Sequence, residues 1–331
     1  MTVVHSGERA VARRHADRVQ SLGPSAALGV LVVVFAALSP QFRTLGNLQS
    51  LLDAGAVLAV VTLGTTFVLL LGSIDLSVAG VMGACALTVS LLVSNSRNGM
   101  ELGFVAVLVT IALGAAFGLL SGGLSVLLKV PTFMTTLGVS AIGLGVATVL
   151  FDGVQPAVED RWLAGWATGR VFGFTHLTYL ALACVALAWA VQRYTRIGRY
   201  AVAIGGAEET LRLSGINVGR YKLAAFAIAG GFYGLAAVMV TAQLGSGVVQ
   251  AGSGLSFAAI TAAVVGGTQL AGGRGGVPHS MIGVLILTVL TNGLVLVGVS
   301  PYVQGAVQGV IVVVAVGATL WPLRHRLEVV K

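Results

Sequence analysis

Ten long apolar runs fill most of this 331-residue chain, and they constrain its fold more than any other feature. They cover residues 24–38, 51–71, 76–93, 102–128, 132–151, 171–191, 223–243, 257–271, 281–299 and 302–320. A helix needs about 20 residues to cross the apolar core of a bilayer, so the runs predict about ten membrane-spanning helices. Only 9% of the residues are charged, against about 25% in ordinary soluble domains. The predicted fold is an all-α, polytopic membrane protein.

Two of the runs, 24–38 and 257–271, are short for a full crossing, which predicts tilted, extended or partly re-entrant segments. Run 24–38 also has the length of a signal-peptide core. No clear small-residue cleavage site precedes Ser39, and a retained first helix is therefore the favoured interpretation.

The basic residues predict the orientation of the chain. With the N-terminus inside and ten crossings, 15 of the 19 Lys and Arg residues lie in the cytoplasm, and Arg43, Arg97, Arg161 and Arg170 lie outside. Cytoplasmic loops carry such an excess of positive charge. We therefore expect a cytoplasmic segment over 1–23, one transmembrane domain over 24–320 and a cytoplasmic tail over 321–331. The net charge of +8 then reports topology rather than nucleic-acid binding, for which no soluble domain remains.

Residues 193–222 form the one strongly charged segment inside the chain. Its basic residues are Arg193, Arg196, Arg199, Arg212, Arg220 and Lys222. Glu208 and Glu209 precede a short stretch that ends at Gly215, which is typical of a helical patch on a loop. Because apolar runs flank this loop on both sides, it is suited to contact a soluble partner at the membrane surface.

Signatures of common enzymes are missing from the sequence. A phosphate-binding loop needs a Gly-Lys pair, but Lys129, Lys222 and Lys331 follow Leu, Tyr and Val. The two cysteines and five histidines show no metal-ligand or disulfide spacing, so neither a metal site nor a disulfide framework is predicted. The chain is not expected to be an enzyme by itself or to bind a cofactor.

A few polar side chains lie deep in the apolar runs and are candidates for a polar path through the membrane. They are Thr65, Thr66, Gln243, Thr291, Asn292, Gln304 and Gln308. Hydroxyl and amide groups offer the weak, replaceable hydrogen bonds that a hydroxylated solute needs. The alternative is hydrogen bonding between helices, worth about 0.6 kcal/mol per contact.

Asp53 and Asp75 are the acidic residues placed in or near the apolar runs. Both fall at predicted helix starts, where a carboxylate accepts free backbone N–H groups, so we expect each to cap a helix. The alternative role, in an ion-coupled carrier, usually needs carboxylates near the middle of the bilayer.

Glycines at four-residue spacing predict close contacts between helices. The sets are Gly114, Gly118 and Gly122, then Gly230 and Gly234, then Gly305 and Gly309. The longest outward loop, 152–170, carries Trp162 and Trp166. These two residues indicate either interfacial anchoring or a docking surface for an extracytoplasmic partner.

Several motifs resemble the permease subunit of bacterial ABC importers of the ribose/monosaccharide class. They are Gly72-Ser73-Ile74-Asp75-Leu76-Ser77, Val130-Pro131-Thr132-Phe133, Thr136-Leu137-Gly138, Thr195-Arg196-Ile197-Gly198-Arg199, Ala203-Ile204-Gly205-Gly206, Leu213-Ser214-Gly215-Ile216, Gly266-Gly267, Gly272-Gly273-Arg274-Gly275 and Thr291-Asn292-Gly293-Leu294. They occur in the family's order and extend over nearly the whole chain.

The resemblance implies a dimeric membrane core, a separate ABC ATPase subunit that binds ATP and Mg²⁺, and a solute-binding protein that delivers a sugar. Glu209, Thr210, Leu211 and Gly215 keep the family's spacing for a short helix that seats in the ATPase. Thr210 and Leu211 replace two alanines, and Ser256 and Ala258 stand where the family carries acidic residues.

Roles for single residues follow from this resemblance as hypotheses. Glu208 and Glu209 contact basic residues of the ATPase or favour the positive end of the short helix. Gly215 lets the chain turn out of that helix. Arg196 and Arg199 hold the segment to the membrane surface, and Asp75 with Ser77 marks a helix start.

Two alternatives remain open. A permease for branched-chain amino acids or nucleosides would share this membrane architecture. A secondary carrier driven by an ion gradient would work without an ATPase.

Overall fold

The computed structural model describes residues 23–300, 303, 305–307 and 309–310. Its elements follow one another as helix Gly23–Leu38, 3-10 helix η1 (Pro40–Arg43), α2 (Leu45–Leu70), α3 (Val78–Leu92), α4 (Phe104–Leu128), α5 (Thr132–Phe151), α6 (Arg161–Thr168), strands β1 (Arg170–Val171) and β2 (Phe174–Thr175), α7 (His176–Tyr194), α8 (Arg196–Leu213), α9 (Val218–Leu244), α10 (Leu255–Val265) and α11 (Val277–Leu296). The two strands form a small antiparallel hairpin in an otherwise helical fold.

Six of the described helices are long and apolar enough to cross a membrane: α2, α4, α5, α7, α9 and α11. The prediction of an all-α polytopic membrane protein is confirmed. Nine of the ten predicted apolar runs overlap a helix, and the tenth, 302–320, lies largely outside the described residues. The number of crossings and the orientation of the termini stay predictions.

Some helices begin several residues before the apolar runs that predicted them, because polar side chains cap their first turns. α2 begins at Leu45, six residues before its run, because the Thr44 side chain accepts the Asn47 N–H at 3.2 Å. In the same way the Asn217 side chain accepts the Arg220 N–H at 3.1 Å and starts α9 at Val218. Each cap supplies an acceptor for a first-turn amide that has no partner inside its helix.

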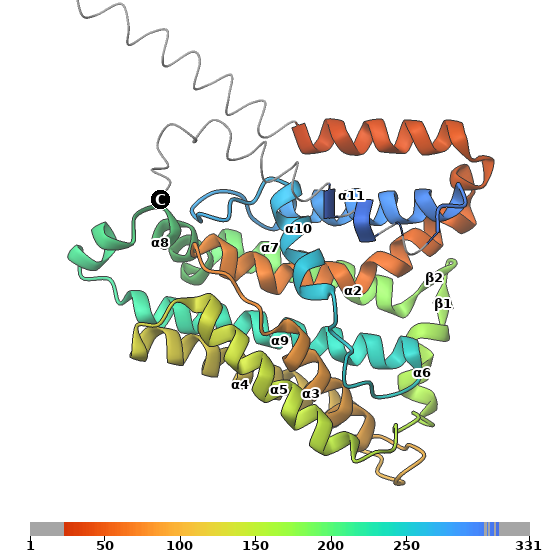
Figure 1. Cartoon of the computed structure of the whole chain (residues 1–331), viewed down its shortest axis with the longest axis horizontal. Helices are drawn as coiled ribbons and strands as arrows, with labels where there is room; N and C mark the ends of the chain where they lie inside the picture. Colours follow the sequence, from red (N-terminus) through yellow and green to blue (C-terminus); the bar gives the residue numbers. More distant parts are fainter. Residues whose placement is uncertain (1–22, 301–302, 304, 308, 311–331) are drawn as a thin grey trace, which may run out of the picture.

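The long helices lie side by side and their connections gather at two ends (Figure 1). α8 and the loop 266–276 lie at one end, and η1, α6 and the β1–β2 hairpin lie at the other. We call the first the α8 end and the second the hairpin end. α2 and α9 form the centre of the fold, where most of α2 is buried, whereas α5 and α7 leave most of their apolar surface exposed. Such exposed apolar surface suits helices that face lipid.

Glycines allow α4 and α9 to touch through their backbones, as the spacing predicted. A Cβ added at Gly114 would fall within 3.0 Å of Gly230 O and of Gly234, and one added at Gly118 would meet Phe226 O. For Gly305 and Gly309 no described residue lies within 4 Å of an added Cβ, and their helix contacts stay a prediction.

The two short inner helices, α3 and α10, are each preceded by non-helical chain. Residues 245–254 leave α9 and run back along α3, where Gly247 lies against Ser90 and Gly252 lies against Ala79. Only then does α10 begin, and its 11 residues span about 16 Å. The re-entrant character of run 257–271 stays a prediction. Non-helical backbone is tolerated inside a membrane only where protein surrounds it.

Candidate coupling and translocation sites

The charged segment 193–222 is mostly helical. α8 runs from Arg196 to Leu213 and breaks at Ala207, whose φ of −162° and ψ of 62° are not helical. The sequence predicted a loop with a short helix only near its end, after residue 208. The structure shows that residues 196–206, before the break, are helical as well. Thr195 starts that half, because its hydroxyl accepts the Gly198 N–H at 3.4 Å.

The second half of α8 ends in a left-handed turn. Gly215 has φ +78°, a conformation that side chains rarely adopt. The N–H of Gly215 donates a hydrogen bond to the carbonyl oxygen of Arg212 at 3.1 Å, and the N–H of Ile216 donates one to the carbonyl oxygen of Leu211 at 3.1 Å. This pair of bonds satisfies carbonyls that a helix end leaves free.

The short half of α8, residues 208–213, presents an exposed tip to solvent. Glu209 and Thr210 are exposed there, and Leu213 is 82% exposed, whereas Leu211 packs partly against the core. We call residues 208–213 the α8 tip.

Glu208 is held by its own chain. Its carboxylate accepts hydrogen bonds from Lys222 Nζ at 2.8 and 2.9 Å and from Arg212 Nη2 at 3.1 Å. Glu208 is thus engaged within its own chain, and a contact between Glu208 and basic residues of another protein stays a prediction. The bridge ties the α8 tip to the first turns of α9, and Glu209 is the exposed carboxylate of the pair.

Three glycine motifs that are far apart in the sequence meet at the α8 end. An added Cβ at Gly205 would lie 2.5 Å from Gly273 N and nearer still to Leu70 O. One at Gly72 would lie 2.9 Å from Ala271 O, and Gly273 N donates to Leu70 O at 3.0 Å. We call Gly72, Gly205, Gly272 and Gly273 the glycine junction. Here α8, the end of α2 and the loop 266–276 touch backbone to backbone.

Direct backbone contact has a mechanical consequence. At the glycine junction the three segments touch through backbone atoms, with no flexible side chain between them that could move aside. Closely packed protein transmits a displacement rather than absorbing it. A movement of α8 would therefore shift α2, which is central to the fold, and the loop that leads into α11.

The helix-start signature is assembled by a second motif. Asp75 is buried, and its Oδ1 accepts the N–H and the hydroxyl of Ser77 at 2.8 and 2.6 Å, at the start of α3. Thr132 and Thr136 of α5 accept the N–H groups of Ile74 and Leu76 at 3.3 and 3.1 Å. Because segment 73–77 is not helical, its N–H groups have no carbonyl partners within a helix. Two hydroxyls of α5 accept the N–H groups of Ile74 and Leu76 in their place.

The candidate path residues do not gather around one cavity. Thr65 bonds Val61 O and lies 3.4 Å from Tyr233 OH, and Thr66 donates to Ser280 Oγ at 2.7 Å. Asn292 forms a mutual amide pair with Asn47 at the start of α2, about 28 Å along that helix from Thr66. These groups make interhelical bonds, as the alternative interpretation had it.

The remaining path candidates are placed differently. Gln243 is exposed near the end of α9. Gln304 and Gln308 lie outside the described residues. Sequence reasoning missed Tyr233 and Ser280, because a single Tyr or Ser in an apolar run carries no local signal.

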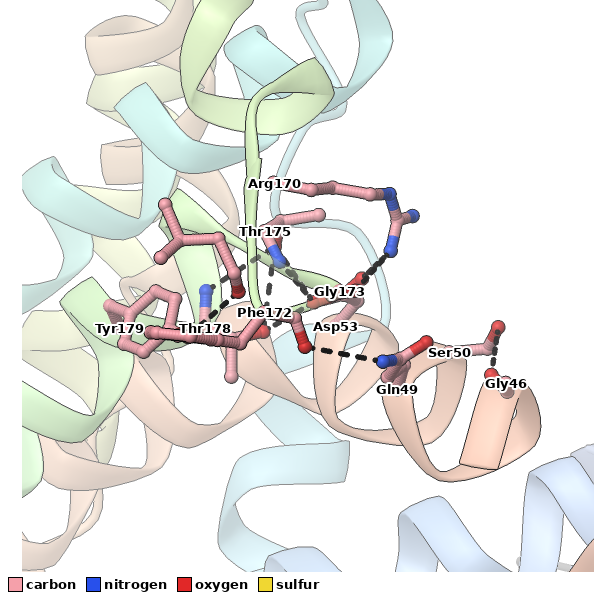
Figure 2. A network of polar contacts seen from close by, with 11 residues as sticks. Gly46, Gln49, Ser50, Asp53, Arg170, Phe172, Gly173, Thr175, Thr178 and Tyr179 are labelled. Atoms are coloured by element: carbon pink, nitrogen blue, oxygen red, sulfur yellow. Dashed lines mark hydrogen bonds and ion pairs between the residues drawn. The ribbon is translucent and has the colours of Figure 1, made fainter. Parts of the chain in front are cut away.

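The prediction that Asp53 lies at a helix start is wrong, although its carboxylate does accept a backbone N–H at the start of a helix. Asp53 lies inside α2 and binds the start of α7, as Figure 2 shows: it accepts the Thr175 N–H at 3.1 Å, the Thr175 hydroxyl at 2.8 Å and the Thr178 hydroxyl. Arg170 Nη1 lies 3.3 Å from its Oδ2. The carboxylate thereby fixes the hairpin and the first turn of α7 to α2.

Arg196 and Arg199 are both exposed on the first half of α8. Arg199 lines a cavity between α7, α8 and α11, and Arg196 does not. Their suggested role in holding this segment to the membrane surface stays a prediction.

Comparisons with known proteins match almost the full length of the chain. Residues 47–316 match the family described as branched-chain amino acid transport system / permease component. The ribose import permease protein RbsC of Escherichia coli strain K12 is 37% identical over 88% of this chain and 90% of its own length. The protein of that name from Bacillus subtilis strain 168 is 34% identical over 92% and 94%.

A relative that is named for a different sugar is also similar. The galactose/methyl galactoside import permease protein MglC of E. coli strain K12 is 32% identical over 87% of this chain and 90% of its own length. No solved structure matches the chain.

Proposed function

Since the chain belongs to the family of branched-chain amino acid transport system permease components, we propose that it is the membrane subunit of an ATP-driven sugar importer. The relatives named for ribose and galactose import, at 32 to 37% identity over nearly the whole chain, support a monosaccharide or similar polyol as the solute. The protein then resides in the bacterial inner membrane as a multi-pass subunit. It is a transport subunit rather than an enzyme.

The observation that carries this proposal is the structure of the α8 end. A braced tip with an exposed Leu213 is joined through the glycine junction to α2 and to the loop before α11. Such a tip suits a separate ABC ATPase, in which ATP and Mg²⁺ bind. Closure of the ATPase would move α8, and the junction would pass that movement to the centre of the membrane domain.

The remaining partners follow from the same proposal. An extracytoplasmic solute-binding protein delivers the sugar at the hairpin end, and a second permease subunit, most simply an identical copy, completes the membrane core. Ten crossings with both termini in the cytoplasm put the α8 tip on the side of the ATPase. Thr65, Thr66, Gln243, Asn292 and Gln304 stay candidates for the path, which requires Thr65, Thr66 and Asn292 to exchange their present bonds for bonds to the solute.

The description of the family itself supports a second solute class, since it names branched-chain amino acids. A carrier driven by an ion gradient is the alternative of another class.

Reconstitution distinguishes these functions. The chain would be placed in proteoliposomes with its ATPase and its solute-binding protein, and uptake of labelled ribose, galactose and leucine would be measured with ATP inside or with a proton or sodium gradient alone. ATP-dependent uptake of a monosaccharide is expected. Uptake of leucine alone would favour the second solute class, and uptake driven by the gradient without the ATPase would refute an ATP-driven importer.

A further inference from the structure

A cavity of about 420 Å³ lies at the α8 end, where the end of α7 meets the first turns of α8 and α11. Its polar lining consists of Arg193, Arg199, Gln192 and His279, and Trp189 forms part of its wall. We call this cavity the basic pocket. It lies in the first half of α8, before the break at Ala207, and thus away from the α8 tip.

The pocket has an uncompensated positive charge. Within the described residues, no acidic side chain lines the pocket, and neither Arg193 nor Arg199 forms an ion pair. Two guanidinium groups with ten N–H donors between them match the geometry of a phosphate group, which accepts paired hydrogen bonds.

Two helix starts add to this positive potential. Gly198 in the first turn of α8 and His279 in the first turn of α11 both line the pocket, and the N-terminus of a helix attracts anions. The Nδ1 atom of His279 is buried and has no hydrogen-bond partner in the described part of the chain. A buried ring nitrogen without a partner needs an explanation, and an anion that accepts its N–H is one that fits a basic pocket.

The surface beside the pocket is apolar and suited to lipid. Trp189 is 44% exposed and packs edge-on against the exposed Tyr194, with ring centroids 5.6 Å apart. Further along α7, Leu182 and Leu187 are also exposed. Aromatic rings of this kind concentrate where membrane meets water, which supports a pocket that opens at the depth of lipid headgroups.

We propose that the basic pocket binds the phosphate of an anionic phospholipid whose acyl chains lie along the exposed face of α7. Basic pockets between transmembrane helices on the cytoplasmic side are suited to such headgroups. The assignment of this lipid to the cytoplasmic leaflet rests on the proposed function and on the orientation of the chain. The binding of the lipid itself does not. A bound lipid would brace α8 against α7 and α11 beside the glycine junction, so the proposal also gives Arg199 its suggested surface role.

The test uses the purified full-length protein in a nonionic detergent and measures bound lipid by native mass spectrometry. The probes are short-chain phosphatidylglycerol, short-chain phosphatidylcholine and inorganic phosphate. The pocket variant is Arg193→Gln with Arg199→Gln. The matched control, Arg43→Gln with Arg220→Gln, removes two exposed arginines that do not line the pocket. A third variant, Arg193→Lys with Arg199→Lys, keeps the charge in case the Gln variant fails to fold.

Phosphatidylglycerol is expected to bind the unchanged protein and the control equally. It should bind the Gln variant about 30-fold more weakly, because each of the two arginines contributes one charge interaction with the lipid that the variant loses. The Lys variant should bind within about fivefold of the unchanged protein, since compact ammonium groups keep the charge but lose the paired geometry. This assay needs neither transport nor the ATPase, so its failure is distinguishable from failure of the proposed function.

Three results would overturn the proposal. Equal weakening in the pocket variant and the control would mean that general positive charge attracts the lipid. Competition by inorganic phosphate at the concentration at which phosphatidylglycerol binds would identify a soluble anion as the ligand. Unchanged lipid binding together with lost ATPase co-purification in the Gln variant would assign the pocket to an acidic surface of the ATPase.

Discussion

Adding one methyl group at Gly205 should uncouple α8 from the membrane helices, whereas the same change at Gly206 should not. A Cβ at Gly205 would lie 2.5 Å from Gly273 N and nearer to Leu70 O, while a Cβ at Gly206 would meet nothing within 4 Å. Real Cβ contacts are essentially never under 3.0 Å, so Gly205→Ala forces the junction to open by at least 0.5 Å. Gly206→Ala leaves the junction as it is.

The two variants differ only in this steric term. Replacing Gly by Ala inside a helix stabilises by about 0.8–1 kcal/mol. Overpacking of a close contact costs about 1–3 kcal/mol. We therefore expect Gly206→Ala to be neutral or up to about 1 kcal/mol more stable, and Gly205→Ala to be about 1–3 kcal/mol less stable than Gly206→Ala.

Two measurements check this prediction. The melting temperature in detergent should be lower for Gly205→Ala than for Gly206→Ala, and ATP-driven uptake in proteoliposomes should fall strongly only for Gly205→Ala. If the two alanine variants melt and transport alike, the backbone contact at Gly205 transmits nothing and the reasoning is refuted.

Three further substitutions test other contacts of the site. Glu208→Gln weakens the bridge to Lys222 and Arg212, which are partly exposed. It should change stability by no more than about 1 kcal/mol yet reduce the ATPase recovered in co-purification, and a normal yield would argue against a role for the bridge. Thr136→Val removes the acceptor of the Leu76 N–H and should destabilise by about 1–3 kcal/mol, as thermal melting would show, whereas an unchanged melting temperature would mean that this N–H needs no partner. Asp53→Asn removes the charge beside Arg170 and should make the hairpin more sensitive to proteolysis than the α8 end, so equal cleavage rates at both ends would contradict the bracing role.

The apolar runs and the motifs were readable from the sequence, because helix length and glycine spacing are local properties. Nine of the ten runs overlap helices, and Gly114 and Gly230 make the kind of contact that their spacing predicts. The motifs were recognised separately, and their spacing gave no sign that Gly72, Gly205 and Gly272 meet.

Partners of charged residues were harder to predict, since they depend on the tertiary fold. Lys222 lies 14 residues from Glu208, and the hydroxyl of Thr175 lies 122 residues from Asp53. The position of Asp53 near the start of an apolar run suggested a cap for its own helix. That run begins six residues after α2 does, because Thr44 caps the helix earlier. Asp53 therefore lies in the interior of α2, where its carboxylate contacts the start of α7.

Cross-linking between the α8 tip and the ATPase tests the central claim most directly. One variant carries Leu213→Cys and the other carries Phe172→Cys at the hairpin end, where the native side chains are 82% and 90% exposed. The native cysteines, Cys85 and Cys184, are buried and should react little. With the importer assembled in membranes, a short reagent that couples to the introduced thiol at one end and is photoactivated at the other should join the ATPase to the Leu213→Cys protein and not to the Phe172→Cys protein. Cross-linking at position 172, or at neither position in an assembled complex, would contradict the account.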